Sequence, residues 1–256
     1  LKAAAKSHGP VVLKVLGLLA ASVAIFFGTL HGVAWARTSP TFGLKTVSVT
    51  GQQEATDVEL ARIAGISLGQ NLWTMEVRNM ERAISAHPWI KSVKVTRRFP
   101  QGLAIEVEEH RAVAMLAIGE LYLVNEESEP FKRIKAGDSF DLPLITGIDR
   151  EQFAEGRDEA MTQLREAIAL IDTYGAEPLV KKQPLSEVHL HPEGVTGVTC
   201  DGQEIEFGEG DVSAKLVRLA RVRKELRARS MVAEVIRLDN RARPSWVAVQ
   251  VSAKKP

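Results

Sequence analysis

The longest apolar stretch of the chain lies close to its start. The segment Val15–Trp35, VLGLLAASVAIFFGTLHGVAW, contains no Asp, Glu, Lys or Arg. A helix rises about 1.5 Å per residue, so a helix of this length crosses the ~30 Å apolar layer of a bilayer and satisfies its own backbone hydrogen bonds there. The pattern therefore predicts a transmembrane helix over residues 15–36, with Trp35 as an aromatic anchor at the membrane–water interface.

The charges around this stretch predict its orientation. Three lysines precede it within residues 1–14, and fewer basic residues follow it closely. Because an excess of positive charge favours the cytoplasmic side, we expect residues 1–14 to be a cytoplasmic tail. This tail is expected to be truncated, since the first residue is not methionine. Residues 37–43 are then expected to form a polar linker, and the residues after it are expected to lie outside the cytoplasm.

Two other interpretations of the apolar stretch stay open. Ala34-Trp35-Ala36 has the small-x-small form of a signal-peptide cleavage site, although the stretch is longer than the usual ~7–15 apolar residues of a signal peptide. A buried core helix is the third interpretation. A membrane anchor and a signal peptide both place the remaining residues outside the cytoplasm.

The region after the linker combines short strand and helix patterns. Alternation of β-branched and polar residues predicts strands, and the capping-box pair Thr56 and Glu59 predicts a helix start. Trp89 follows the helix-ending Pro88 and is expected to fill the core. The predicted order is strand, helix, helix, strand, strand, with a tight turn before the last strand: Leu44–Thr50, a two-turn helix from Thr56, Met75–Ala86, Val93–Thr96 and Leu103–Glu108.

The second half of the chain predicts a larger domain that is mostly β. An amphipathic stripe predicts a helix over Arg157–Tyr174, and a second helix follows the N-cap residue Asp211 and ends near Arg229. Pro143 makes Leu142–Gly147 a short or edge strand. Seven further strands are predicted: Ala112–Ile118, Leu121–Asn125, Val188–His191, Val195–Cys200, Glu204–Phe207, Met231–Leu238 and Trp246–Val251.

Composition narrows the functional classes. The 256 residues carry a net charge of +1, so overall charge does not indicate nucleic acid, and the single cysteine, Cys200, cannot form an internal disulfide. The sequence contains no G-x-S-x-G, H-E-x-x-H, Walker A or G-x-G-x-x-G motif. We therefore expect no catalytic residue, cofactor, metal, nucleic acid or small-molecule substrate. The same absence disfavours an exported hydrolase.

Two clusters of polar residues have alternative interpretations. His189 and His191 lie on one face of a strand, but a tight HPEG turn places Cys200 away from them, so exposed histidines are favoured over a metal site. The segment Lys215–Arg229 holds seven basic residues and one acidic residue. Its apolar face leaves the arginines for solvent, which is the favoured interpretation; contact with anionic lipid, a partner or nucleic acid is the alternative.

Residues 44–112 carry a family resemblance. The strand–helix–helix–strand–strand order, together with GQNLW, HPWI and the hairpin VKVTRRFP…IEVEEH, resembles the POTRA domain of the bacterial division family FtsQ/DivIB. Ala112 stands where that family often has proline. The family implies a second, β-rich domain over residues 113–256, and Leu142–Gly147 is similar to its "LP-x-[LI]-x-G" segment. The fold class is therefore α+β: a transmembrane helix, a β-α-α-β-β POTRA domain and a mixed, mostly antiparallel β domain with helices.

The resemblance implies a function without catalysis. Members of the family are single-pass inner-membrane proteins that bind other divisome proteins, FtsB and FtsL above all and also FtsK-, FtsW- and FtsI-like proteins, and help to assemble the septal peptidoglycan machinery. The alternative is a POTRA-containing protein of outer-membrane assembly or secretion. That alternative predicts repeated POTRA units or a strand-rich membrane barrel, and no internal repeat is visible in the sequence.

The candidate partner-binding residues lie near the end of the chain. The segment from Val235 is similar to the family's "V-D-L-R-Y", with Asp239 and Arg241 matched, while Asn240 and Ala242 differ where the family contacts FtsB and FtsL. The strand that follows is expected to be an open edge to which a partner segment can add. The predicted binding residues are Asp239, Arg241, Trp246, Val247 and Val249, with a place in the domain's own core as the alternative for Trp246.

Overall fold

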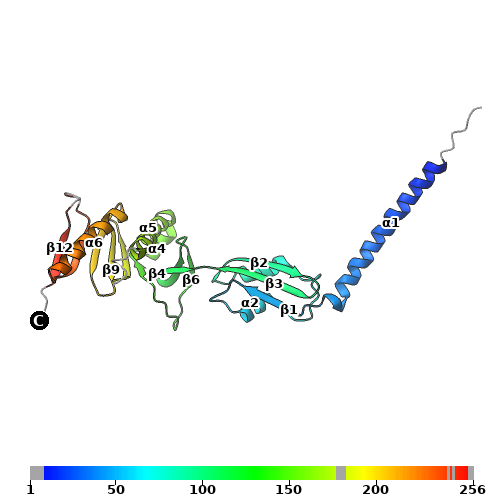
Figure 1. Cartoon of the computed structure of the whole chain (residues 1–256), viewed down its shortest axis with the longest axis horizontal. Helices are drawn as coiled ribbons and strands as arrows, with labels where there is room; N and C mark the ends of the chain where they lie inside the picture. The colour runs from blue at the N-terminus through cyan, green and yellow to red at the C-terminus, as the bar shows by residue number, and fades with distance from the viewer. Residues whose placement is uncertain (1–8, 177–182, 241–242, 244–245, 253–256) are drawn as a thin grey trace, which may run out of the picture. The chain divides into compact units, whose positions relative to one another are not determined.

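The chain divides into two compact units, Leu1–Glu109 and His110–Pro256 (Figure 1). The computed structural model describes residues 9–176, 183–240, 243 and 246–252. The two units have separate hydrophobic cores, and each is described by itself below.

The first unit begins with the long apolar helix α1, Gly9–Thr38. Its segment Lys14–Thr38 has a mean hydropathy of 1.8, and it is long and apolar enough to cross a membrane by its length and composition. Side chains from Lys14 to Trp35 are exposed, so α1 is not the buried core helix that was one interpretation of the sequence. The helix ends two residues later than predicted, and the 3-10 turn η1, Pro40–Phe42, follows it.

The rest of the first unit has the predicted β-α-α-β-β order. Its elements are β1 Thr46–Thr50, α2 Asp57–Ile63, α3 Val77–Ser85, β2 Ile90–Arg98 and β3 Gly102–Glu109. The sheet order is β1-β3-β2, with β1 parallel and β2 antiparallel to the central β3. Leu60 of α2 and Ile84 of α3 share one buried cluster with Ile105 of β3, so both helices cover the same face of this sheet. Trp89 is also buried, as the sequence predicted.

The carboxylate of Glu109 holds the loop that precedes α2. It accepts hydrogen bonds from the backbone N–H groups of Gln53, Glu54 and Ala55 at 3.0, 2.8 and 2.9 Å. Thr56 then caps α2, because its hydroxyl accepts from the Glu59 N–H at 3.2 Å. The C-terminal end of β3 is thereby fixed to the start of α2.

The second unit is built on a single sheet of nine strands, within the residues that the structure describes. The spatial order is β12-β11-β10-β9-β8-β7-β4-β5-β6. Three of its neighbouring pairs are parallel and five are antiparallel, which agrees with the predicted mixed sheet. The strands are β4 Ala112–Ile118, β5 Glu120–Asn125, β6 Pro130–Arg133, β7 Leu144–Thr146, β8 Leu185–His191, β9 Gly194–Thr199, β10 Glu204–Gly208, β11 Val232–Arg237 and β12 Ala248–Ser252.

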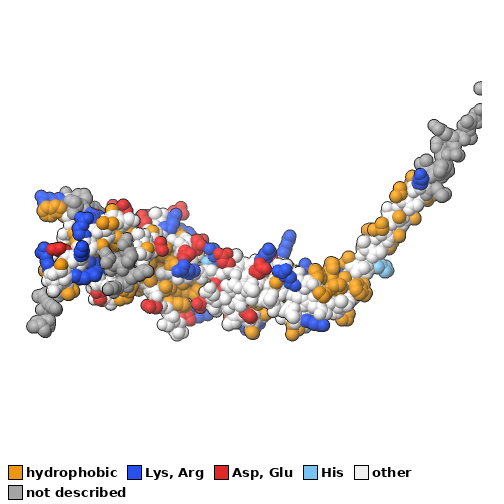
Figure 2. Space-filling view, in the orientation of Figure 1, with side chains coloured by type: hydrophobic (Ala, Val, Ile, Leu, Met, Phe, Trp, Pro, Cys, Tyr) orange, Lys and Arg blue, Asp and Glu red, His pale blue; other side chains and the backbone are white. Residues whose placement is uncertain are grey.

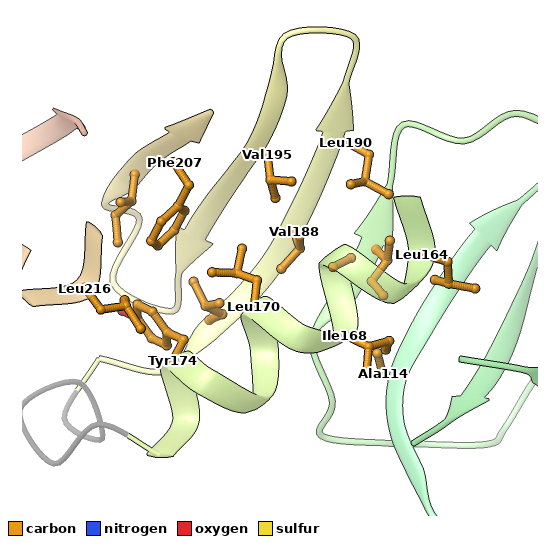
Figure 3. Close-up of a cluster of buried hydrophobic side chains, with 14 of the residues drawn as sticks. Ala114, Leu164, Ile168, Leu170, Tyr174, Val188, Leu190, Val195, Phe207 and Leu216 are labelled. Carbon is orange, nitrogen blue, oxygen red and sulfur yellow. The ribbon is translucent and has the colours of Figure 1, made fainter. Parts of the chain in front are cut away.

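The helices α5, Arg157–Ala176, and α6, Val212–Ala228, share one buried cluster with the strands of the sheet. Figure 3 shows Leu164, Ile168 and Tyr174 of α5 pointing toward side chains of the strands and of α6. Both helices therefore lie on one face of the sheet. The short helix α4, Arg150–Glu155, and the strand β6 were not predicted from the sequence.

The position of β7 decides between the two alternatives predicted for it, a short strand or an edge strand. The strand is short, as Pro143 suggested, but it lies in the interior of the sheet between β4 and β8 and not at an edge. Pro143 precedes the strand by one residue, so its missing N–H is not needed for the ladder, and its carbonyl accepts from the Met115 N–H at 2.9 Å. Gly147 ends β7 with φ +95°, and a Cβ there would lie 1.9 Å from the carbonyl oxygen of Leu190. The close approach of the two backbones therefore requires glycine.

The Glu109 contact leads to a prediction on stability. Glu109→Gln removes the negative charge of the carboxylate that accepts hydrogen bonds from three N–H groups. The free energy of unfolding of the first unit should therefore fall by about 1.5–3 kcal/mol. Urea unfolding of the whole chain in detergent, followed by circular dichroism, measures this change. Glu108→Gln is the matched control, because the Glu108 carboxylate is exposed and lies 3.6 Å from Lys91 Nζ. Equal effects of the two variants would contradict the proposed role of Glu109.

Candidate partner-binding edge

The strand β12 lies at one edge of the nine-stranded sheet. It pairs antiparallel with β11, with Ile236 opposite Val249 and Arg237 opposite Ala248, and no described strand pairs with its other side. Every second N–H and C=O group of an edge strand points away from the sheet. The structure therefore offers β12 as a template on which a further strand can form.

The two edges of this sheet differ. The opposite edge strand, β6, is only four residues long and begins with Pro130, which has no N–H to donate. Its ladder with β5 is also irregular next to this proline. Short strands and prolines are features that prevent edge pairing. The strand β12 contains neither proline nor lysine, so it is the edge that remains competent for strand addition.

The side chains around β12 alternate between the core and solvent. Val247 and Val249 are half-buried and pack against the core of the unit, whereas Ala248 and Gln250 are exposed. The strand begins at Ala248, two residues later than the sequence predicted. The side chains of Val247 and Val249 therefore hold β12 against the core. At the edge of the sheet, these two residues present backbone groups and not side chains.

Trp246 lies just before β12 and is 58% exposed, so it is not the core tryptophan that the sequence allowed as an alternative. The Trp246 N–H donates to the Arg243 carbonyl at 2.8 Å, and the Arg243 guanidinium carbon lies 4.3 Å from the centre of the indole ring. The amide oxygen of Asn240 accepts from the Arg243 N–H at 2.9 Å. A cation–π contact at this distance holds an exposed aromatic surface beside the edge.

Asp239 lies at the end of β11 and not on the open edge. It packs so closely against Gly208 that a Cβ at Gly208 would lie 2.2 Å from a carboxylate oxygen of Asp239. Burial lowers the pKa of the nearby Lys215, and the negative charge of Asp239 opposes this shift. The Lys215 ammonium donates to the carbonyl oxygens of Phe207, at 2.6 Å, and of Glu209. Asp239 thus supports the packing of β11 on β10 and α6. Arg241 lies outside the described residues.

A buried polar network joins the edge to the helices behind it. The Arg223 guanidinium of α6 donates to the side-chain oxygen of Gln203 at 2.6 and 3.1 Å and to the Tyr174 hydroxyl at 3.1 Å. The Gln203 amide nitrogen donates to the Ala233 carbonyl at 3.0 Å. Ala233 pairs with Val251 next to an irregularity in the β11–β12 ladder. The network therefore fixes β11, which in turn carries β12.

The protonation state of Tyr174 suits this network. Burial raises the pKa of its hydroxyl above the ordinary value, while the positive charge of Arg223 lowers it. The hydroxyl therefore stays protonated at neutral pH. It accepts from Arg223 and donates to the Gln183 carbonyl at 2.8 Å. The hydroxyl is therefore satisfied both as a donor and as an acceptor although the residue is buried.

These network residues correct the interpretation of the basic helix. Exposed side chains of α6 include Arg221, Lys224 and Arg227, but Lys215 and Arg223 are buried. From the sequence, all the arginines of this helix were predicted to be exposed to solvent. The sequence did contain a signal for the burial of Arg223. This residue follows the core residues Leu216 and Leu219 at spacings of seven and four, so it lies on the same face of the helix.

The two histidines of β8 make hydrogen bonds within the unit. A ring nitrogen of His189 lies 2.8 Å from the Thr146 hydroxyl, and one of His191 lies 2.8 Å from the Thr196 hydroxyl. Cys200 lies at the other end of the β8–β9 hairpin, where its N–H donates to the Pro184 carbonyl. In the part of the chain that the structure describes, no group of three or more His, Cys, Asp or Glu side chains is arranged to hold a metal ion.

Comparison with known families covers both units. Residues 42–110 match the model of the POTRA domain, FtsQ-type, and residues 112–241 match that of the cell division protein FtsQ/DivIB, C-terminal. The second match ends before β12. The alternative of an outer-membrane assembly or secretion protein does not account for this C-terminal match.

Curated relatives align over most of the chain. The cell division protein FtsQ of Myxococcus fulvus is 49% identical over 98% of this chain and 89% of its own length. The FtsQ protein of Anaeromyxobacter sp. is 41% identical over 83% of this chain and 72% of its own length. The cell division protein DivIB of Solibacillus silvestris is 24% identical over 69% of this chain and 59% of its own length.

The network behind the edge yields a prediction. Arg223→Leu keeps a side chain of similar bulk but leaves Gln203 and Tyr174 without their buried partner, so the second unit should lose about 1–3 kcal/mol of unfolding free energy. Arg221→Leu on the exposed side of α6 is the control and should change it by no more than ~0.5 kcal/mol. Hydrogen exchange of the β11 amides should accelerate in the first variant alone. Unchanged exchange in β11 would show that the network does not hold this strand.

Proposed function

Since the chain belongs to the FtsQ/DivIB family of cell division proteins, we propose that it acts without catalysis, as a membrane-anchored scaffold for other division proteins. It is a single-pass protein of the inner membrane, with residues 1–14 in the cytoplasm and the helix 15–36 as its uncleaved anchor. The linker 37–43, the POTRA domain 44–112 and the β domain 113–256 lie in the periplasm. The exposed apolar surface of α1 supports the anchor, and the lysines before it support the orientation.

The strand β12 captures its partner by strand addition. An extended segment of an FtsB- or FtsL-like protein pairs with the free backbone groups of the edge, which supplies affinity with little dependence on side chains. Val247 and Val249 keep the edge in place from the core side. The single observation that carries this proposal is an apolar edge strand whose outer side pairs with no described strand, in a sheet whose other edge begins with proline.

Trp246 anchors the partner beside this edge. An exposed indole that becomes buried on association contributes more to binding than most contacts, and Arg243 already holds this indole in place. Asp239 keeps the end of β11 in position for the same surface. The matched position Arg241 belongs to the segment between Asp239 and Trp246, where we propose that it contributes to the contact.

The scaffold serves the assembly of the septal peptidoglycan machinery. Contacts with FtsK-, FtsW- and FtsI-like proteins extend the same role, because a membrane-anchored protein with two separate units offers several surfaces at once. The proposed function involves no nucleic acid, small-molecule substrate, metal or cofactor.

The role of Trp246 can be measured directly. Trp246→Ala should weaken binding of an FtsB/FtsL-like complex by about 2 kcal/mol, which is roughly 30-fold in Kd, because the central aromatic contact is lost. The whole chain in lipid nanodiscs is titrated with the purified partner complex. Val217→Ala, at a residue that is 59% exposed on α6, is the control and should leave Kd unchanged. Loss of circular dichroism in Trp246→Ala would instead assign the residue a structural role.

Backbone pairing is tested in the same complex. Amide hydrogens of β12 should exchange more slowly once the partner is bound, because the outward N–H groups become hydrogen-bonded. Binding of the partner with unchanged exchange in β12 would refute strand addition while leaving the scaffold role intact.

A further inference from the structure

Four aromatic side chains gather where α1 meets the POTRA domain. Phe42 has its ring centre 5.9 Å from that of Trp35, 6.1 Å from that of Trp73 and 6.1 Å from that of Phe99. The rings of Trp73 and Phe99 lie 5.2 Å apart. These residues come from the end of α1, from η1, from the loop before α3 and from the tip of the β2–β3 hairpin. We call this group the aromatic patch.

The aromatic patch is exposed. Trp35, Trp73 and Phe99 have 60%, 42% and 51% of their surface open to solvent, and Leu68 in the loop of Trp73 is 73% open. Figure 2 shows hydrophobic side chains gathered at this end of the unit, continuous with the apolar surface of α1. A contiguous apolar surface of this kind on a folded domain marks a site that is covered by a protein or a membrane.

The patch is fixed to the end of α1 by hydrogen bonds. The side-chain amide of Asn71 donates to the carbonyl oxygens of Ala36 and Ser39 at 2.9 and 3.0 Å. The Leu72 N–H donates to the Phe42 carbonyl at 2.9 Å, and the Asn71 side-chain oxygen accepts from the Trp73 N–H at 2.9 Å. The residues expected to be a polar linker therefore hold the loop of Trp73 against the helix end.

We propose that the aromatic patch inserts into the interfacial layer of the bilayer that α1 crosses, so that the POTRA domain is seated on the membrane surface. The patch continues the apolar surface of a helix long enough to span a membrane, and it lies at the end of that helix, where the interface must be. Tryptophan is enriched at this depth because its ring is apolar while its N–H can still reach water or headgroups.

Basic side chains next to the patch suit the same position. A cleft beside Trp73 is lined by Arg37, Arg78, Arg82 and Arg97 and by two glutamates. Arg97 Nε is buried and has no hydrogen-bond partner among the described residues. Phosphate groups of lipid headgroups lie just outside the layer that aromatic rings occupy, and arginine binds them well. The chemistry of the cleft therefore matches its place beside the inserted rings.

The inference rests on the proposed membrane anchor and adds a second contact with the same bilayer. A domain held only by a flexible tether would sample many orientations. A domain held by a helix and by an interfacial patch has a restricted tilt, because residues outside the helix also contact the bilayer. This orientation determines which surfaces of the POTRA domain face neighbouring membrane proteins.

Tryptophan quenching in a bilayer tests the proposal. The whole chain carrying Trp35→Phe and Trp246→Phe keeps Trp73 and the buried Trp89 as fluorophores. It is reconstituted in phosphatidylcholine vesicles whose lipids are brominated near the start of the acyl chains. The patch should lie ~5–10 Å deep in the boundary between headgroups and acyl chains, close to these bromines, so emission from Trp73 should fall roughly two-fold relative to unbrominated vesicles.

Two matched variants complete the experiment. The triple Phe variant at positions 35, 73 and 246 gives the background from Trp89. The variant with Phe at 35 and 73 reports Trp246, which is also exposed but lies outside the aromatic patch. Quenching of Trp73 clearly above that of Trp246 supports the proposal. Equal quenching of Trp73 and Trp246 by the brominated lipids overturns the proposal. Acrylamide in the aqueous phase gives a second readout: if it quenches Trp73 as strongly in vesicles as in detergent, Trp73 is not inserted. Either result would leave the patch as a surface for a protein partner.

Failure of the anchor itself has a separate readout. Flotation of the vesicles after alkaline carbonate extraction reports whether α1 is inserted. Protein that floats but shows no quenching of Trp73 refutes only the seating of the POTRA domain. Protein that does not float refutes the membrane anchor on which this inference depends.

Discussion

An open sheet of nine strands must end in two edges, and the second unit is organised around that constraint. Its helices cover one face of the sheet from a single core, and they leave the outer hydrogen-bonding sides of the end strands uncovered by any described strand. One end is closed to pairing by the short strand β6 and its proline. At the other end, the outward-facing backbone N–H and C=O groups of β12 are not paired with any described strand. This asymmetry is the basis for our proposal that a partner associates at the β12 end of the domain.

The position of that free edge depends on buried polar groups as well as on apolar packing. Arg223 and Gln203 connect the helix layer to the carbonyl of Ala233, and Lys215 connects α6 to the end of β10. Each group is satisfied in the folded unit and would be costly to leave unpaired. The network thereby holds β11, the strand on which the candidate edge strand β12 pairs.

Much of the fold followed from local patterns in the sequence. The hairpin from Ile90 to Glu109 and the caps at Thr56 and Asp211 depend on residues close in sequence, and they formed as predicted. The interior place of β7 did not follow, because its parallel partners are supplied by strands distant in sequence. The spacing of Arg223 from Leu216 and Leu219 indicates the buried face of its helix, but its partners could not be predicted, because they come from α5 and from the β9–β10 turn. The sequence left two alternatives for Trp246, a core position or an exposed one, and the structure shows it exposed beside Arg243.

The pairing of β1 with β3 has a mechanical consequence. The membrane helix joins the chain before β1, and the second unit joins it after β3, while the two strands run parallel with Thr46 opposite Gly102 and Thr50 opposite Glu106. Tension between the membrane and a captured partner would pull these strands lengthwise in opposite directions. The hydrogen bonds between β1 and β3 would then be loaded in shear, so that all of them bear the force together. A force that peeled the strands apart from one end would instead break these bonds one at a time. If the chain captures a partner as we propose, the POTRA sheet would carry this tension as a coupling loaded in shear.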